Sequence, residues 1–458
     1  MQTFAIQLDD RALSLARTGR VLQTGPSVVF DGGTSAAPGT PGWDALRSQP
    51  TATSSRHLGS VLSGIAGGRG VGGGRGAQLL AAELRRRLIE QPPDPGEPVW
   101  IAAPAGAETQ GLGVVLAIAQ SIGLTVTGFV DSAVATVASM EAAGDAIVLE
   151  VGLHHVAATA VGVAGGQVRR HRSVLSRNGG LLDLYQAWLR LISTAMMRQT
   201  RFDPLHDALI EQRLFGDLPA LGETAAQHGS VTVHVDHGSE RFSVELTRDQ
   251  FADAAGAWSR TVTGLIHQLR PAGAPLRLIA PRSVVGFPGP RQELEQFAEC
   301  ELIRVPDGYA AAAVSLLDLA ANADGVHLMR RLSLQPLAGL VHTLARESLG
   351  ESRGRAAPAS HVLFEGRAFS LGGAPLVVGR DPANPSALVL PDGLAGVSRR
   401  HCTFISDGEE RLLLDHSSYG TFVNGERVAE RVRVRAGDRI RIGEPGVELA
   451  LIAVGQGG

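Results

Sequence analysis

Apolar positions along the first 330 residues recur with two different periods, which separates predicted strands from predicted helices. Runs that alternate apolar and polar residues, or that are apolar throughout, predict strands. Longer runs with apolar residues three and four positions apart predict amphipathic helices. The main predicted helices are 77–91, 109–123, 132–143, 178–197, 248–270, 291–299 and 308–320. The main predicted strands lie within 1–30 and at 99–104, 124–130, 145–168 (two strands about Gly152), 230–247 (a hairpin), 276–281 and 300–305.

The order of these elements predicts an α/β fold. Strands and helices alternate over residues 77–168, and a second set with a similar layout follows over residues 178–320. Such alternation places helices against the faces of a sheet. We therefore expect a two-lobed domain with related lobes over residues 1–330. Residues 31–76, which are rich in Gly, Ser, Pro and Thr, are predicted to be a flexible surface loop.

The pattern changes after residue 330. Residues 331–360 are predicted to be a helix and a linker, because the periodicity weakens and "ESRGRAAPAS" has the composition of a linker. From His361 onward only short apolar runs remain, separated by turn residues at short intervals. This pattern is typical of a small all-β sandwich, so residues 361–458 are predicted to form a separate domain.

Composition and charge exclude several classes of function. Of the 458 residues 19% are charged, and the net charge is -3, which gives no electrostatic basis for binding nucleic acid or an anionic membrane surface. The chain has neither an apolar run of about 18 residues nor a signal-peptide pattern, so no membrane insertion is predicted. Cys300 and Cys402 lie far apart and form no metal motif. We expect a cytoplasmic protein with no nucleic-acid partner.

Three short motifs in the last hundred residues carry chemistry that suits a phosphate group. They are Gly379–Arg380, "SRRH" at 398–401 and "SSYGTFVNG" at 417–425. In their order and spacing they resemble the forkhead-associated (FHA) domain, a β-sandwich that binds phosphothreonine peptides. A phosphothreonine carries close to two negative charges and three acceptor oxygens, which guanidinium and hydroxyl donors satisfy.

The resemblance implies a role for each residue of these motifs. The residues expected on the phosphate side are Arg380, Ser398, Arg399, Gly420 and Thr421. Tyr419 stands where the family often has an asparagine that holds the bound peptide, so the peptide contacts depart from the family pattern. Gly379 and His401 are expected to support the loops from below. Asn424 is either a turn residue or a ligand-side group. A sandwich that has lost binding is the alternative interpretation.

The N-terminal elements resemble a second family. Residues 98–142 combine a strand that ends at Pro104, the helix end "AIAQSIGL" and an acidic residue, Asp131, that opens a small-residue helix. They are similar to the centre of the ATPase domain of DnaK-type heat-shock chaperones, which has an actin-like fold. Asn178–Gly180 and "PDGYAAAAVSLL" at 306–317 continue the resemblance. It implies two lobes with a nucleotide cleft.

Two of the nucleotide loops that this resemblance implies lack the expected chemistry. The first phosphate loop has Gln7 in place of a carboxylate and Asp9 in place of a glycine. A carboxylate at Asp9 would repel a nucleotide phosphate. The adenosine loop reads "APRSVVG", with Arg282 in what should be a glycine-rich run.

The second phosphate loop is also altered. It keeps Glu150 and Gly152, but Leu153, His154 and His155 replace the glycines and the hydroxyl. Bulky side chains prevent the close backbone approach to phosphate that glycine permits. The adjacent histidines face opposite sides if they lie on a strand, so no shared metal site is expected from them.

These observations predict an adaptor with a pseudo-ATPase domain and no cofactor. The FHA domain would bind a threonine-phosphorylated protein, and the actin-like domain would present a surface to a second protein. Glu150 and Asp131 leave binding of magnesium and nucleotide open. The alternatives are a working chaperone-like ATPase regulated through its FHA domain, and a scaffold in an assembly machine, as some actin-like proteins are in pilus and division complexes.

Overall fold

The computed structural model divides the chain into two units, Met1–Ala345 and Arg346–Gly458. The described residues of the first unit are 3–30, 42–64, 74–141, 144–270, 275–295, 297, 299–321, 326–341 and 344. Those of the second unit are 359–364, 367–372, 374–381, 387–391, 396–407, 410–423, 426–428, 430–434, 438–443 and 447–452. No helix among these residues is both long enough and apolar enough to cross a membrane.

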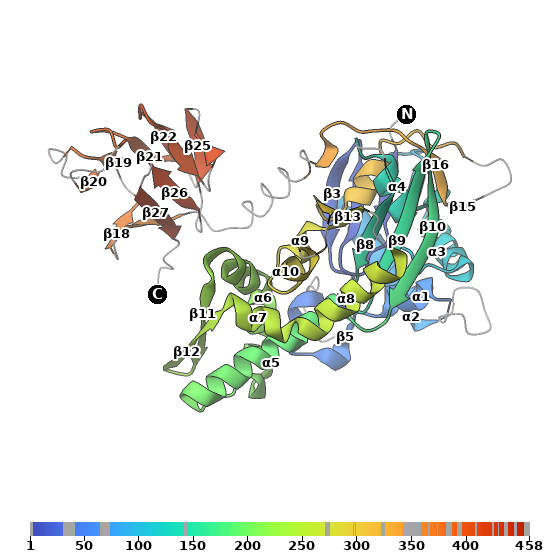
Figure 1. The fold of residues 1–458 in the computed structure, drawn as a ribbon, viewed down its shortest axis with the longest axis horizontal. Helices are drawn as coiled ribbons and strands as arrows, with labels where there is room; N and C mark the ends of the chain where they lie inside the picture. Colours follow the sequence, from blue (N-terminus) through green and yellow to red (C-terminus); the bar gives the residue numbers. More distant parts are fainter. Residues whose placement is uncertain are drawn as a thin grey trace. The chain divides into compact units, whose positions relative to one another are not determined.

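Two six-stranded mixed sheets form the framework of the N-terminal unit (Figure 1). The first sheet has the strand order β15-β7-β6-β1-β2-β3. Its strands are β1 (Phe4–Gln7), β2 (Leu13–Arg17), β3 (Arg20–Gly25), β6 (Val99–Ala103), β7 (Val126–Asp131) and β15 (Leu328–Met329). Strands β1, β6, β7 and β15 run parallel, and β2 and β3 extend the sheet antiparallel to β1.

The second sheet has the order β14-β13-β8-β9-β10-β16. Its strands are β8 (Ala146–Val151), β9 (Val156–Ala164), β10 (Gln167–Ser176), β13 (Leu276–Pro281), β14 (Cys300–Val305) and β16 (Arg331–Ser333). Strands β8, β13 and β14 run parallel, and β9 and β10 form the antiparallel meander. Five strands of each sheet therefore share one topology, which confirms the prediction of two halves with a related layout.

The helices connect and cover these strands. In the first half they are α1 (His57–Leu62), α2 (Arg75–Glu90), α3 (Thr109–Ser121) and α4 (Ser132–Ala138). In the second half they are α5 (Leu181–Thr200), α6 (Ala208–His228), α7 (Arg248–Ala254), α8 (Gly256–Leu269), α9 (Arg282–Val285), α10 (Pro290–Glu295) and α11 (Tyr309–Val314). The hairpin β11 (Ser230–His237) and β12 (Glu240–Thr247) packs against α5 and α6.

Two short helices made of small residues join the halves reciprocally. Helix α4 follows a strand of the first sheet but also packs against β9, β10 and β16 of the second sheet. Helix α11 follows a strand of the second sheet and packs against β1, β2 and β6 of the first sheet. The Tyr309 hydroxyl in α11 lies 3.1 Å from the Ser139 hydroxyl at the end of α4. Alanine side chains allow such close packing, and both helices are buried in one shared core.

A strap after α11 crosses from one sheet to the other. Strand β15 adds to the outer edge of β7, and β16, which begins two residues later, pairs with β10 of the second sheet. Leu340 and Leu344 are then buried in the core around α4 and α11. The predicted boundary at residue 330 is therefore wrong, because residues up to 345 belong to the N-terminal unit.

The structure corrects three other details of the sequence-based prediction. Part of the predicted flexible loop 31–76 is ordered: two 3₁₀ turns (Gly42–Ala45 and Pro50–Ala52), β5 (Thr53–Ser54), which pairs with β4 (Val29–Phe30), and α1 lie within it. Residues 31–41 and 65–73 lie outside the described residues. The predicted helix 248–270 is two helices that meet at Ala255. The prediction missed α6, although Asp207 caps it through the backbone N–H groups of Leu209 and Ile210.

The C-terminal unit is the predicted β-sandwich. One sheet has the order β18-β17-β27-β26-β23-β24, and the other has the order β20-β19-β21-β22-β25. The strands are β17 (His361–Phe364), β18 (Arg367–Ser370), β19 (Leu376–Gly379), β20 (Ala387–Val389), β21 (Cys402–Asp407), β22 (Glu410–Asp415), β23 (Thr421–Val423), β24 (Glu426–Arg427), β25 (Arg431–Val434), β26 (Arg439–Ile442) and β27 (Val447–Ile452). Alternating apolar side chains from both sheets fill one core.

Candidate functional site

Two loops of the C-terminal unit meet where β19 ends. The backbone N–H of Arg380 donates to the carbonyl of Ser398 at 3.2 Å, and that of Asp381 donates to the carbonyl of Arg399, also at 3.2 Å. This pairing needs glycine at position 379, because a Cβ there would lie 2.0 Å from the Arg399 carbonyl oxygen. The close approach holds Arg380, Ser398 and Arg399 side by side.

His401 fastens a third loop to these two. Its Nδ1 accepts a hydrogen bond from the backbone N–H of Ser398 (3.1 Å), and its Nε2 lies 3.2 Å from the Gly420 carbonyl oxygen, to which it donates. Both bonds are satisfied by the neutral ring with its proton on Nε2. Burial lowers the pKa of His401, which favours that neutral form. The His401 side chain is fully buried and bridges the Ser398 and Gly420 loops, the place expected of a residue that supports them.

The Arg380 guanidinium has no counter-ion within the described part of the unit. Its Nε atom is buried and makes no hydrogen bond. The Ser398 hydroxyl is half-buried and the Arg399 side chain is exposed, and neither has a partner among the described residues. An unpaired buried donor costs roughly 1–3 kcal/mol, more when it is charged. This arrangement leaves a cation and a hydroxyl ready for an anion from outside the unit.

The family model for the FHA domain matches residues 376–443. Residues 376–443 form an FHA domain. The match covers the three loops described above and lies wholly within the β-sandwich. A comparison of the chain with curated proteins gave no match.

The structure does not place Thr421 on the phosphate side of the FHA domain, where it was expected. Thr421 is fully buried, and its hydroxyl donates to the Asp415 carboxylate at 2.8 Å. Its role is to hold Asp415, which also accepts from the backbone N–H of Ser417 (3.0 Å), and so to fix the loop that carries Tyr419. Asn424, predicted to be a turn or ligand-side residue, lies outside the described residues.

The loop between β22 and β23, residues 416–420, which we call the ligand loop, carries an exposed hydroxyl that was not predicted, that of Ser418. Ser418 is exposed, and no bond to its hydroxyl occurs among the described residues, whereas the neighbouring Ser417 hydroxyl accepts from the Gly420 N–H at 2.7 Å. Tyr419 is 65% exposed, a large fraction for an aromatic ring. It stands beside the site as a surface against which a peptide could pack.

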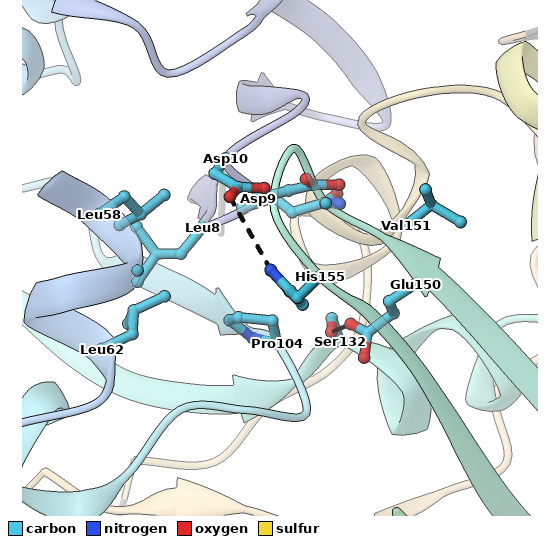
Figure 2. Close-up of a pocket in the computed structure, with 13 residues that line it drawn as sticks. Leu8, Asp9, Asp10, Leu58, Leu62, Pro104, Ser132, Glu150, Val151 and His155 are labelled. Atoms are coloured by element: carbon cyan, nitrogen blue, oxygen red, sulfur yellow. Dashed lines mark hydrogen bonds and ion pairs between the residues drawn. The ribbon is translucent and has the colours of Figure 1, made fainter. Parts of the chain in front are cut away.

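The residues predicted to form a degenerate nucleotide cleft meet in the N-terminal unit. Gln7, Asp9, Glu150, Gly152 and His155 line one pocket between the first and second halves, together with Asp10 and Ser132 (Figure 2). The cavity volume is about 20 Å³. That is room for about one water molecule.

The Asp10 side chain, from the turn between β1 and β2, lies against the turn between β8 and β9. The chaperone resemblance implies that this second turn would face a phosphate. One of its carboxylate oxygens accepts from the backbone N–H of Leu153 at 2.8 Å, and the other lies 3.8 Å from His155 Nδ1 (Figure 2). The turn carbonyls of Gly152 and Leu153 accept from the first N–H groups of α5. A Cβ at Gly180 would lie 2.3 Å from the Leu153 carbonyl oxygen, so glycine permits this contact. An internal carboxylate thus stands at the turn where an anion would bind.

Arg11 crosses from the first half to the second. Its Nε donates to the carbonyl of Val151 at 2.7 Å, and its Nη1 donates to Ser283 Oγ (2.9 Å) and to the Asp307 carboxylate (2.8 Å). Asp9 lies 3.6 Å away and accepts from the backbone N–H of Arg11. Burial raises the pKa of Asp9. Asp9 was predicted only to repel a phosphate, whereas here it lies beside a buried arginine. Arg11 was not predicted, because its partners in the second half lie more than a hundred residues away in the sequence.

Two other predicted residues of the cleft, Asp131 and Gln7, have internal partners. Asp131 caps α4 through the N–H groups of Ala133 and Val134, and its other oxygen pairs with Arg170 of β10 at 2.8 Å. The Gln7 side chain accepts from the backbone N–H of Ala311 in α11. The contacts of Asp131 therefore use both oxygens of one of the two carboxylates, Asp131 and Glu150, that could have bound magnesium. Among the described residues, no group of three His, Cys, Asp or Glu is arranged to hold a metal ion.

Glu150 is a second buried acid of the cleft whose pKa is raised. It accepts hydrogen bonds from the Ser132 hydroxyl and, at 3.1 Å, from the backbone N–H of Ala105. Burial, followed by the nearby Asp131 charge, raises its pKa to about 7.

His154 and Arg282 lie apart from this acid. His154 lies in the turn, 2.9 Å from the Ser55 hydroxyl, and therefore does not share a site with His155. Arg282 begins α9 and is not among the described residues that line the pocket.

We expect replacement of Arg11 by alanine to destabilise the N-terminal unit. Asp307 and the Val151 carbonyl would lose a charged partner, at a cost of roughly 3 kcal/mol in the free energy of unfolding. Chemical denaturation of the full chain measures the effect. The control is Arg190→Ala, an exposed arginine of α5. Equal stability of the two variants would contradict the stabilising role of Arg11. The stability of Arg11→Lys should fall between them, because lysine keeps the charge but lacks the several donors of a guanidinium.

We expect Glu150 to make stability depend on pH. Its pKa in the folded chain, about 7, lies above its ordinary value of 4.5, so its contribution is fully present below the ordinary value and is lost as pH rises through about 7. Relative to Glu150→Gln, the wild type should lose up to roughly 3 kcal/mol between about pH 5 and pH 8. Denaturation curves at several pH values test this, with Glu223→Gln, on the exposed face of α6, as control. A constant difference between wild type and Glu150→Gln would rule the linkage out.

Proposed function

We propose that this protein is an adaptor that binds a threonine-phosphorylated protein through its FHA domain. The observation that carries the proposal is the Arg380 guanidinium, whose buried Nε has no hydrogen-bond partner among the residues that the structure describes. A phosphate dianion would satisfy it with charge-assisted hydrogen bonds, which are about twice as strong as neutral ones. The hydroxyl groups of Ser398 and Ser418 supply further donors on the two adjoining loops.

We propose in addition that the N-terminal unit is a pseudo-ATPase of the actin-like fold that presents a fixed surface to a second protein. Two halves of one topology support the fold, as do the small-residue helices that cross between them. The loss of hydrolysis is supported by the internal ion pairs and by the Asp10 carboxylate, which accepts from the backbone N–H of Leu153 in the turn between β8 and β9. No specific observation favours the working ATPase over this interpretation.

Binding of a phosphothreonine peptide is expected to depend on Arg380. Arg380→Ala should weaken binding about 10- to 100-fold, since a hydrogen bond to a charged group contributes about 1.5–3 kcal/mol. Fluorescence anisotropy of the full chain with a phosphothreonine peptide library and its unphosphorylated counterpart measures this. Arg431→Ala, which removes an exposed arginine from β25, is the control. If no phosphopeptide binds better than its unphosphorylated form, the adaptor proposal fails.

Magnesium and ATP at millimolar concentration are expected to leave the Tm of the chain unchanged. The cavity of about 20 Å³ is far smaller than a nucleotide, and its charged groups are paired internally. Thermal denaturation with and without the nucleotide tests this, because a ligand that binds the folded state raises Tm. A rise in Tm that Glu150→Ala abolishes would support the working ATPase instead.

A further inference from the structure

A second arginine lies directly against the ligand loop of the FHA domain. Strand β24 folds back on β23 and places Arg427 opposite Phe422. The Arg427 Nε lies 2.8 Å from the point that a Cβ on Gly420 would occupy. Because Gly420 directly follows Tyr419, the guanidinium of Arg427 rests on the backbone of the loop that would contact a bound peptide.

Arg427 is free to interact with a ligand. Its side chain is exposed, and no ion pair or hydrogen bond of its guanidinium occurs among the described residues. Asp415, the carboxylate of the adjoining loop, is already bonded to Ser417 and Thr421. The Asp415 carboxylate is therefore engaged, and the Arg427 guanidinium has no ion-pair partner among the described residues.

The edge holds more positive charge than one phosphate requires. Arg380 and the two loop hydroxyls can satisfy a phosphate, which leaves the exposed guanidiniums of Arg399, in the loop before β21, and of Arg427, on β24. Like charges kept close together repel one another, and a ligand that carries carboxylates beside its phosphate relieves that repulsion. The two exposed arginines thus favour a ligand that has negatively charged residues beside its phosphothreonine.

We propose that the FHA domain selects phosphothreonine segments that are flanked by aspartate or glutamate, and that Arg427 is the residue that reads this charge. The inference rests on the proposed phosphothreonine binding. It implies that the phosphorylation reaction that supplies the partner accepts threonine within an acidic stretch. The pair between Arg427 and a flanking carboxylate is exposed, so its effect is modest, about fivefold in affinity for one pair, and it weakens with added salt.

The test compares three peptides by fluorescence anisotropy with the full chain. One carries phosphothreonine between acidic residues, one replaces those acids by asparagine and glutamine, and one is the acidic peptide without phosphate. Wild type should bind the first about fivefold or more tighter than the second, and the third only weakly. Arg427→Ala should bring the first peptide to the affinity of the second and leave the second unchanged.

Two more variants separate a charge effect from a folding defect. Arg427→Glu should reverse the preference, so that the amide-flanked peptide binds better than the acidic one. Arg367→Ala removes an exposed arginine from β18, at the opposite edge of the same sheet, and should change neither affinity. Equal binding of the two phosphopeptides by wild type, or an equal loss for both in Arg427→Ala, would overturn the inference while phosphate-dependent binding stands. Failure of all phosphopeptides would instead overturn the proposed function.

Discussion

The N-terminal unit depends on one buried cation, the Arg11 guanidinium in the turn between β1 and β2. Every side-chain hydrogen bond of Arg11 among the described residues goes to the second half, to the Val151 carbonyl, the Ser283 hydroxyl and the Asp307 carboxylate. Removing a charge from water costs several kcal/mol unless partners replace the water, so these groups must stay where Arg11 can reach them. The ion pair of Arg170 with Asp131 also joins the halves, but here the arginine belongs to the second half and the carboxylate to the first. The two halves are therefore held together by charge at the pocket that lies between them.

The two units use the same chemical group in opposite ways. Arg11 is 8% exposed and fully paired within the chain, and its charge serves the fold. Arg380 is held by its backbone in a loop that glycine and histidine fix, yet its buried Nε has no partner. A folded chain tolerates an unpaired buried donor only where the rest of the structure stabilises it, and such groups concentrate at binding sites. Arg11 therefore serves the fold through a paired charge, whereas Arg380 keeps a buried donor unpaired among the described residues at the point where the FHA loops meet.

Local patterns in the sequence predicted much of the fold, and distant pairings account for most of what they missed. Amphipathic periods located α2, α3 and α5, and short alternating runs located the strands of the FHA sandwich. The three loop motifs located Arg380, Ser398 and His401, because the FHA resemblance depends on short, ordered segments. Arg11 could not be found in this way, since its partners are 140, 272 and 296 positions distant. Thr421 was misassigned because a hydroxyl in a motif gives no sign of whether it faces the ligand or the core. Arg427 did leave a signal, since the turn predicted at Asn424 returns the chain beside Phe422.

The strap that carries β15 and β16 also determines how mechanical load enters the N-terminal unit. A pull on the chain beyond residue 345 acts first on the segment that ends in Leu340 and Leu344, whose side chains are anchored in the core around α4 and α11. Upstream of these leucines, the backbone N–H groups of Leu337 and Gln335 donate to the carbonyls of Ser139 and Ala138 at the end of α4. Further upstream, three residues of β16 pair with β10 and two of β15 pair with β7. A tethered partner would therefore load both sheets and the end of α4 through one continuous segment of chain.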